Sequence, residues 1–92
     1  MPGRQTSKPK ISACLVIANE AAVLERCLSS LQGVTDEIVL VHDGPCVDES
    51  LDIASRFGAK VFVANKIGEA EPHRPFSYEQ ATGEWVLQIE YQ

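Results

Sequence analysis

Apolar residues in the first third of the chain form two patterns, which predict a buried strand and then an amphipathic helix. Residues 11–17 are almost all apolar, as is typical of a parallel strand covered on both faces. Over residues 19–32 the apolar positions recur every three or four residues and form one stripe along a helix. Asn19 is a candidate N-cap for this helix, and Gly33 is placed to end it.

The same succession of strand and helix repeats further along the chain. Residues 37–41 predict a second strand, and the helix that follows can be capped by Asp48 and stopped by Gly58. A short third strand is expected at residues 60–63. Two strand–helix units in succession predict right-handed crossovers and a parallel sheet, which is the α/β class.

The last third opens with the longest irregular segment, residues 64–73, which is polar and contains one glycine and one proline. Long loops in compact domains tend to carry function. Pro75 suits the first turn of a third helix that runs to Ala81. A fourth strand follows at residues 84–89, and we expect its Trp85 to fill space in the core.

Composition then narrows the class of protein. A chain of 92 residues with 45% hydrophobic content predicts one globular domain, here residues 11–92, behind a disordered basic tail at residues 1–10. A net charge of −5 argues against nucleic acid as a partner, because phosphate binding needs clustered cations. No apolar run is long enough to span a membrane. Three cysteines without a paired spacing favour a reducing, cytoplasmic location.

Polar residues follow three of the predicted strands at the point where each ends. Asn19 and Glu20 come after the first strand, Asp43 and Gly44 after the second, and Glu90 after the fourth. The carboxyl ends of parallel strands meet at one edge of a sheet, so these residues can face a common ligand. An aspartate there can accept hydrogen bonds from a base or ribose, and a glycine lets a ligand approach the backbone.

Each of these positions also has a purely structural interpretation. The Asn19–Glu20 pair can serve only to begin a helix, and the Asp43–Gly44 pair can be turn chemistry. His42 is expected to orient the loop rather than to act as an acid or base. His73, in a segment with several acidic neighbours, is expected to lie in a solvated, mixed-charge loop.

Five short segments occur in an order and at spacings that are more specific together than any one of them is alone. They are residues 16–20, 28–31, 36–44, 54–61 and 81–87. On these segments the chain resembles the N-terminal, nucleotide-binding half of a family 2 glycosyltransferase of the GT-A fold. The resemblance implies a three-layer αβα, Rossmann-like sandwich on a four-stranded, mainly parallel sheet in the order 3-2-1-4, as a truncated GT-A domain.

The resemblance also implies roles for individual residues. Asp43 matches the family's aspartate that contacts the nucleobase, and Glu20, beside Asn19, matches a glutamate near the nucleoside. Arg74 matches an arginine near the base and phosphates. Glu90 falls at the first aspartate of the family's metal-binding motif. The expected nucleotide-binding residues are therefore Asn19, Glu20, Asp43, Gly44 and Arg74, with Glu90 as a weak metal ligand. The donor would be a nucleotide-diphosphate sugar, most often of the UDP type.

The chain departs from the family pattern in ways that bear on activity. Gln92 replaces the second metal-binding aspartate, and an amide is a poorer ligand for Mn²⁺ or Mg²⁺ than a carboxylate, so metal binding is doubtful. Pro75 stands where the family usually has asparagine. The acceptor-binding half and its catalytic base are also absent from this chain.

These departures leave two functions open. We expect either the sugar-nucleotide-binding portion of an inverting glycosyltransferase, inactive as this isolated chain, or a non-catalytic, degenerate transferase-fold module for protein interaction. The fourth strand would normally be flanked by later elements, so its free edge or uncovered face predicts a homodimer.

Overall fold

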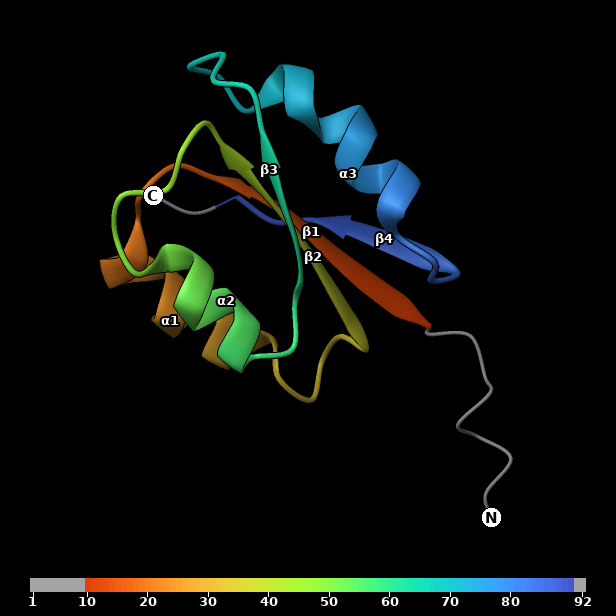
Figure 1. Ribbon diagram of the computed structural model, residues 1–92. Coiled ribbons are helices and arrows are strands. Elements are labelled where there is room, and N and C mark those ends of the chain that lie inside the picture. Colours follow the sequence, from red (N-terminus) through yellow and green to blue (C-terminus); the bar gives the residue numbers. More distant parts are fainter. Residues whose placement is uncertain (1–9, 91–92) are drawn as a thin grey trace.

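The computed structural model describes residues 10–90, and its elements follow the predicted succession of strands and helices (Figure 1). In chain order the elements are β1 (Ile11–Ile17), α1 (Ala21–Leu31), β2 (Glu37–Asp43), α2 (Ser50–Arg56), β3 (Lys60–Ala64), the 3₁₀ turn η2 (Glu71–His73), α3 (Arg74–Gln80) and β4 (Trp85–Gln88). The predicted tail falls largely in residues 1–9, and Gln92 falls at residues 91–92; both lie outside the described residues.

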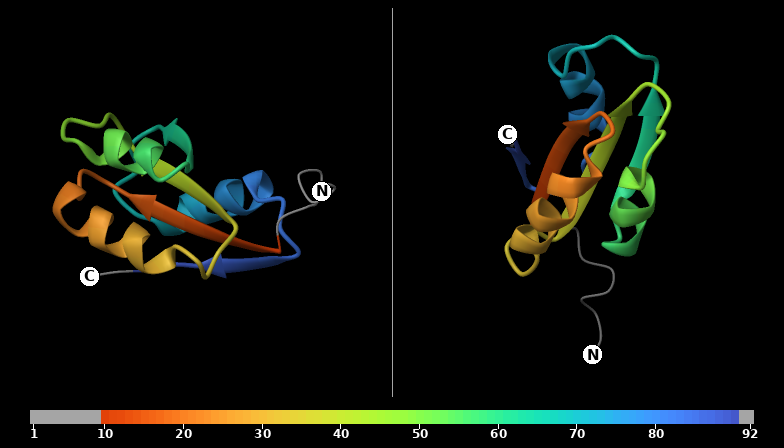
Figure 2. Two further views of the ribbon diagram at one scale, coloured as in Figure 1. Left: turned by 90° about the horizontal axis from the view of Figure 1, so that it is seen from below. Right: turned by 90° about the vertical axis from the view of Figure 1, so that its left-hand side faces the viewer.

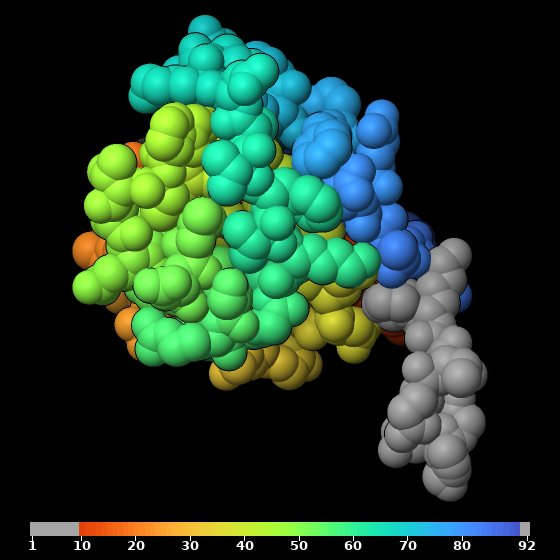
Figure 3. Space-filling model, viewed as in Figure 1, coloured from red at the N-terminus to blue at the C-terminus, as the bar shows by residue number. Residues whose placement is uncertain are grey.

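The four strands form one sheet in the order β3-β2-β1-β4, and every neighbouring pair is parallel. The predicted strand order is therefore confirmed. β1 lies in the interior of the sheet, where Leu15 is opposite Leu40 of β2 and Ile11 is opposite Trp85 of β4. β3 and β4 form the two edges. In the space-filling view, β3 crosses the front of the molecule between α2 and α3 (Figure 3).

The alternation of side chains along β1 divides the molecule into three layers. Ala13, Leu15 and Ile17 face α1 and α2, whereas Cys14 points the other way, with its Sγ 3.5 Å from the carbonyl oxygen of Ser77 in α3. Figures 1 and 2 show α1 and α2 together on one face of the sheet and α3 on the other. The chain thus has the three-layer αβα architecture that its sequence predicts.

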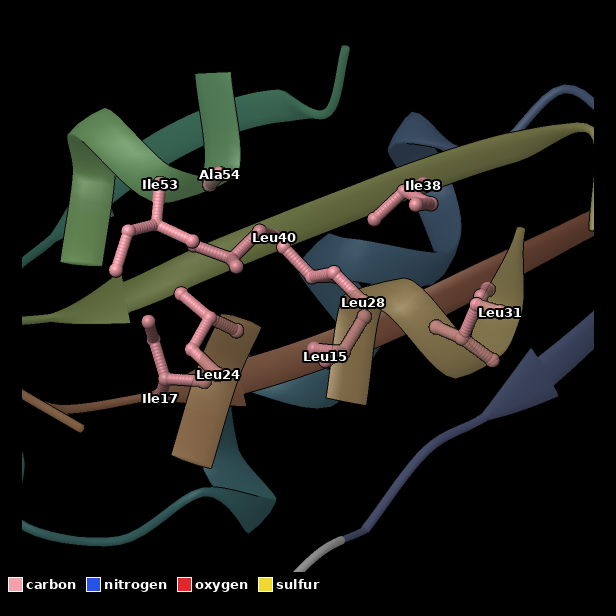
Figure 4. Packing of buried hydrophobic residues seen from close by; sticks show 10 residues of the cluster. Leu15, Ile17, Leu24, Leu28, Leu31, Ile38, Leu40, Ile53 and Ala54 are labelled. Carbon is pink, nitrogen blue, oxygen red and sulfur yellow. The ribbon is translucent and has the colours of Figure 1, made fainter. Parts of the chain in front are cut away.

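A cluster of ten buried hydrophobic residues lies between the sheet and helices α1 and α2 (Figure 4). Leu24 and Leu28 of α1 are completely buried against Leu15 and Leu40 of the strands, and Ile53 of α2 extends the same cluster. A buried leucine or isoleucine contributes roughly 1.5–3 kcal/mol to folding relative to an exposed one. The apolar stripe predicted from residue spacing is therefore the stripe that anchors α1.

Two expectations about single residues are wrong. Asn19 is not the N-cap of α1: it has a positive φ of 53°, its side chain binds the N–H of Val47, and Glu20 occupies the cap position. Trp85 is not a core residue, because it is 66% exposed. All four residues of β4 are exposed, since it is an edge strand that pairs with β1 on one side.

The helices are short. The longest helix among residues 10–90 is α1, with 11 residues, and no helix in that part of the chain has the length and apolar character needed to cross a membrane.

Candidate functional site

A small cavity opens just past the carboxyl ends of β1 and β2. Its volume is about 160 Å³, and the residues that line it come from these two strand ends and from the loop after β3. They are Val16, Ile17, Ala18, Glu20, Asp43, Gly68, Glu69 and Ala70. This is the edge of a parallel sheet where ligands bind in α/β folds. Two of the predicted nucleotide-binding residues, Glu20 and Asp43, therefore line one cavity.

The carboxylate of Asp43 accepts hydrogen bonds from three donors. Its Oδ1 lies 2.7 Å from the backbone nitrogen of Ile67 and 2.7 Å from Nε2 of His73, and its Oδ2 lies 2.9 Å from the nitrogen of Gly68. The N–H of Ile67, followed by His73, holds the pKa of Asp43 at about 2. The side chain is therefore an ionised acceptor at neutral pH, and it fixes the loop after β3 over the end of β2.

Glu20 and Asn19 are held in a tight turn after β1. Glu20 accepts the N–H of Ala18 at its Oε1 (3.1 Å), and its own N–H donates to the hydroxyl of Ser50 at 3.1 Å. Asn19 accepts the N–H of Val47 at 2.7 Å, and it does not line the cavity. Asparagine adopts a positive φ more readily than most other residues, which suits the backbone of this turn. In this structure Asn19 therefore holds the loop that carries Val47 and contributes nothing to the cavity lining.

His42 connects the turns that follow β1 and β2 through hydrogen bonds from both of its ring nitrogens. Its Nε2 accepts the N–H of Asn19 at 3.0 Å, so the proton of the neutral ring sits on Nδ1, which donates to the carbonyl oxygen of Gly44 at 2.7 Å. Both ring nitrogens are engaged, and the side chain is fully buried. The prediction that His42 orients the loop is confirmed.

Asp48 joins the beginnings of the two helices on the core side. Its Oδ1 accepts the N–H of Ser50 at 2.8 Å, and its Oδ2 accepts the N–H of Ala21 at 3.1 Å. Bonds to Ser50, above all, hold the pKa of Asp48 at about 2. One carboxylate thus accepts the first N–H of α1 and the first N–H of α2. Asp48 was expected to be the N-cap of α2, but Glu49 occupies that position, and Asp48 binds the helix from one residue earlier.

Gly44 is needed where it stands because of its backbone and its neighbour. Its φ is +83°, and its N–H donates to the carbonyl of Ala64 at 2.9 Å. A Cβ added here would lie 2.8 Å from the Cβ of Lys66. The group that approaches Gly44 in this structure is therefore the loop after β3, and close approach of a ligand stays a prediction.

Arg74 and Glu90 bind each other and do not line the cavity. The guanidinium of Arg74 is held at Nε by Glu71 (3.2 Å) and at Nη2 by Glu90 (3.2 Å), and the same Glu90 oxygen accepts from Gln88 at 2.8 Å. The Arg74 side chain is only 12% exposed. Of the sequence-predicted residues, Glu20 and Asp43 thus line the cavity, whereas Arg74 and Glu90 pair with each other outside its lining.

The described residues do not fit a divalent metal ion. Glu90, the predicted ligand, already accepts two hydrogen bonds at one oxygen, and no cluster of three His, Cys, Asp or Glu side chains occurs within residues 10–90. Gln92, the other position of the predicted motif, lies outside that part of the chain.

His73 is the site residue that sequence reasoning missed. It was expected in a solvated loop, but its side chain is 6% exposed and bound to Asp43. The sequence contains no periodic signal for it, because it comes from an irregular segment and meets Asp43 across 30 residues. Gly68, Glu69 and Ala70 of the same segment also line the cavity without having been predicted.

Comparison with known protein sequences gives matches to glycosyltransferases. Residues 12–89 match the family described as glycosyl transferase family 2. An uncharacterized glycosyltransferase of Rickettsia felis is 33% identical over 81 residues, which are 88% of this chain and 28% of that protein. Another, from Rickettsia bellii, is 35% identical over 81 residues and 27% of its length. The chain thus spans less than a third of these curated relatives.

A solved structure shows the same fold. The crystal structure of glucosyl-3-phosphoglycerate synthase from Mycobacterium tuberculosis, in complex with Mn²⁺, uridine diphosphate and glucosyl-3-phosphoglycerate, superposes with a TM-score of 0.63 at 23% identity. The match covers 97% of this chain and 38% of that one. The fold is therefore that of part of a GT-A domain.

Proposed function

Because this chain belongs to glycosyl transferase family 2, we propose that it is the donor-binding portion of a glycosyltransferase and that its cavity receives the nucleobase of a nucleotide-diphosphate sugar. One observation carries the proposal. The cavity lies at the carboxyl ends of β1 and β2, and it is lined by Glu20 and by the ionised Asp43. A buried acceptor at such a strand end suits a ring with N–H donors.

The size of the cavity supports a base rather than a whole nucleotide. At about 160 Å³ it is smaller than pockets for drug-sized ligands, which measure roughly 300–1,000 Å³. The sugar and diphosphate would then lie outside it. Uridine diphosphate is the first ligand to test, because the structural neighbour was solved with it and a uracil ring offers an N–H to a carboxylate acceptor.

Arg74 would have to exchange partners before it could bind a phosphate. Its guanidinium is held by Glu71 and Glu90, so a diphosphate would compete with these two carboxylates. We derive no metal-dependent step, since the described residues do not fit a metal ion. The chain spans less than a third of its curated relatives, so we expect the 92-residue protein to bind nucleotide without transferring sugar.

A titration followed by amide NMR tests the proposal. Addition of UDP, with and without Mn²⁺, should shift the amides of Glu20, Asp43 and Gly68 and leave α2 unmoved. Asp43→Asn should weaken the shifts, because an amide accepts less strongly than a carboxylate. Asp52→Asn, on the exposed face of α2, is the control with the same charge change. No shift at millimolar UDP in the folded protein would refute the proposal.

The exposed surface of β4 favours a second candidate function, association with another copy of the chain. Trp85, Val86 and Leu87 are 66%, 42% and 41% exposed, and β4 pairs only with β1 among the described strands. Sedimentation equilibrium should then show dimers that Leu87→Lys dissociates. A monomer at all concentrations in both proteins would exclude this candidate.

The oxidation state of the three cysteines supports a proposal about the cellular compartment of the protein. Cys14, Cys27 and Cys46 are all free thiols, and burial raises the pKa of Cys14 and of Cys27. We place the protein in the reducing cytoplasm on this ground, and fractionation with a tagged chain tests it.

A further inference from the structure

Asp43 reaches the cavity only in the orientation that its hydrogen-bond partners impose. Its Oδ1 accepts two donors, the N–H of Ile67 and Nε2 of His73. Its Oδ2 accepts one, the N–H of Gly68. Each carboxylate oxygen has about two acceptor directions, so Oδ1 is filled by the protein and Oδ2 retains one. A ligand donor in the cavity would therefore meet Oδ2.

His73 is the side chain that fills Oδ1. The Nε2 to Oδ1 distance is 2.7 Å, and the two side chains are each 6% exposed. An ionised carboxylate only accepts, so the proton of this bond is on Nε2 of the histidine. The bond is thus shielded from water, where a hydrogen bond to a charged group is strongest.

The backbone around His73 restricts where its ring can point. Pro72 precedes it within η2 and Pro75 lies in the first turn of α3, so two of the neighbouring φ angles are fixed. The N–H of His73 is itself bound to the carbonyl of Ala70 at 2.9 Å. The ring is therefore presented to Asp43 from a rigid junction between η2 and α3.

From this geometry we propose that His73 is a positioning residue, which holds Oδ1 of Asp43 so that Oδ2 is presented to the nucleobase. The proposal rests on the function proposed above and assigns to it a residue outside the cavity lining. The alternative is that His73 only fills space beneath the loop after β3, in which case its donor is irrelevant to binding.

A pair of variants separates these roles. His73→Gln keeps an N–H donor at the end of a side chain of similar reach, whereas His73→Leu keeps apolar bulk and removes the donor. We expect UDP affinity, from the NMR titration, to fall about tenfold in His73→Leu and to stay within about threefold of wild type in His73→Gln. Equal affinity in wild type and His73→Leu, or an equal loss in both folded variants, would overturn the proposal.

A second readout does not depend on nucleotide binding. The ¹³C resonance of the Asp43 carboxyl, followed against pH without ligand, should titrate higher in His73→Leu than in wild type, and the amide of Ile67 should shift. His73→Gln should restore both toward wild type. If wild type binds no UDP but these shifts occur, the proposed function fails and the positioning contact stands. If the Asp43 titration is the same in wild type and His73→Leu, the positioning role fails.

Discussion

Single polar side chains, rather than regular secondary structure, hold the loops at the site. His42, Asp43 and Asp48 each accept at least one backbone N–H from a segment distant in sequence. These bonds satisfy backbone groups that the sheet and helices leave unpaired, and an unpaired buried group costs free energy. At the scale of the residue, removing one of these acceptors should therefore also destabilise the distant loop or helix end whose N–H it binds.

His42→Leu tests this for the two strand-end turns. The change leaves the N–H of Asn19 and the carbonyl of Gly44 without their side-chain partner, so the free energy of unfolding should fall by about 2–4 kcal/mol. Urea denaturation measures it. Ser30→Ala, which removes an exposed hydroxyl bond to the carbonyl of Cys27, should cost less than about 1 kcal/mol. Equal effects of the two changes would contradict the assigned role of His42.

Gly44→Ala tests the close approach of Lys66. The variant combines the strain of a positive φ, about 1–2 kcal/mol, with a Cβ placed 2.8 Å from the Cβ of Lys66. Gly33 is a matched control, because its φ is +82° and nothing lies within 4 Å of its added Cβ. Urea denaturation should show a larger loss for Gly44→Ala than for Gly33→Ala. The same loss in both would mean that the loop carrying Lys66 moves aside at no cost.

At the scale of the element, Glu37 joins three strands at the opposite end of the sheet. Its carboxylate accepts from Ser12 of β1 at 2.6 Å, from Lys60 of β3 at 2.6 Å, and from the N–H and hydroxyl of Thr82 before β4 at 2.8 Å and 3.0 Å. Its side chain is 8% exposed. Burial alone would raise the pKa of Glu37, but these donors together hold it at about 2.

This network makes stability depend on pH in a defined direction. The folded pKa of Glu37 lies below its unfolded value, so its contribution is complete above about pH 4.5 and is lost as the pH falls toward 2. Glu37→Gln should lower the free energy of unfolding at pH 6 by an amount of the order of 2 kcal/mol and should lower it less at pH 3. Urea denaturation at the two pH values measures this. The exposed Glu25→Gln is the control, and a loss in Glu37→Gln that is independent of pH would contradict the argument.

The elements themselves were predictable, whereas the contacts between loops were not. Residue spacing predicted α1 because Leu24, Leu28 and Leu31 recur on one face, and it predicted β1 from a continuous apolar run. His73 and Asn19 were misjudged because their partners lie more than 25 residues away. The order of the sheet came from the family resemblance, whereas the convergence of Glu20 and Asp43 at one sheet edge followed from the expected parallel strands.

At the scale of the whole molecule, burial is uneven across the sheet. Leu28 is fully buried between α1 and the sheet, whereas Leu87 of β4 is 41% exposed. Trp85 was expected in the core because a large aromatic side chain is often buried, but burial also requires a covering layer, and all four residues of β4 are exposed. The strand would be covered only by a partner or by further sequence.

Two leucine truncations measure this asymmetry. Leu28→Ala should reduce the free energy of unfolding by about 2–5 kcal/mol, because it leaves a cavity in the core. Leu87→Ala should cost less than about 1 kcal/mol at concentrations where the protein is monomeric. Urea denaturation across a range of protein concentrations tests both values. A large cost for Leu87→Ala in the monomer would mean that β4 is better covered than its exposure indicates.

The position of β1 within the sheet has a consequence for how the chain folds. The Ser12 hydroxyl donates to Glu37, 25 residues away, and accepts the N–H of Gly83, 71 residues away. Closing the longer loop costs more chain entropy, and the short, exposed β4 returns little burial for it. We expect β1 and β2 to pair early and β4 to join last and to detach first. Amide hydrogens of β4 should therefore exchange with solvent well before those between β1 and β2.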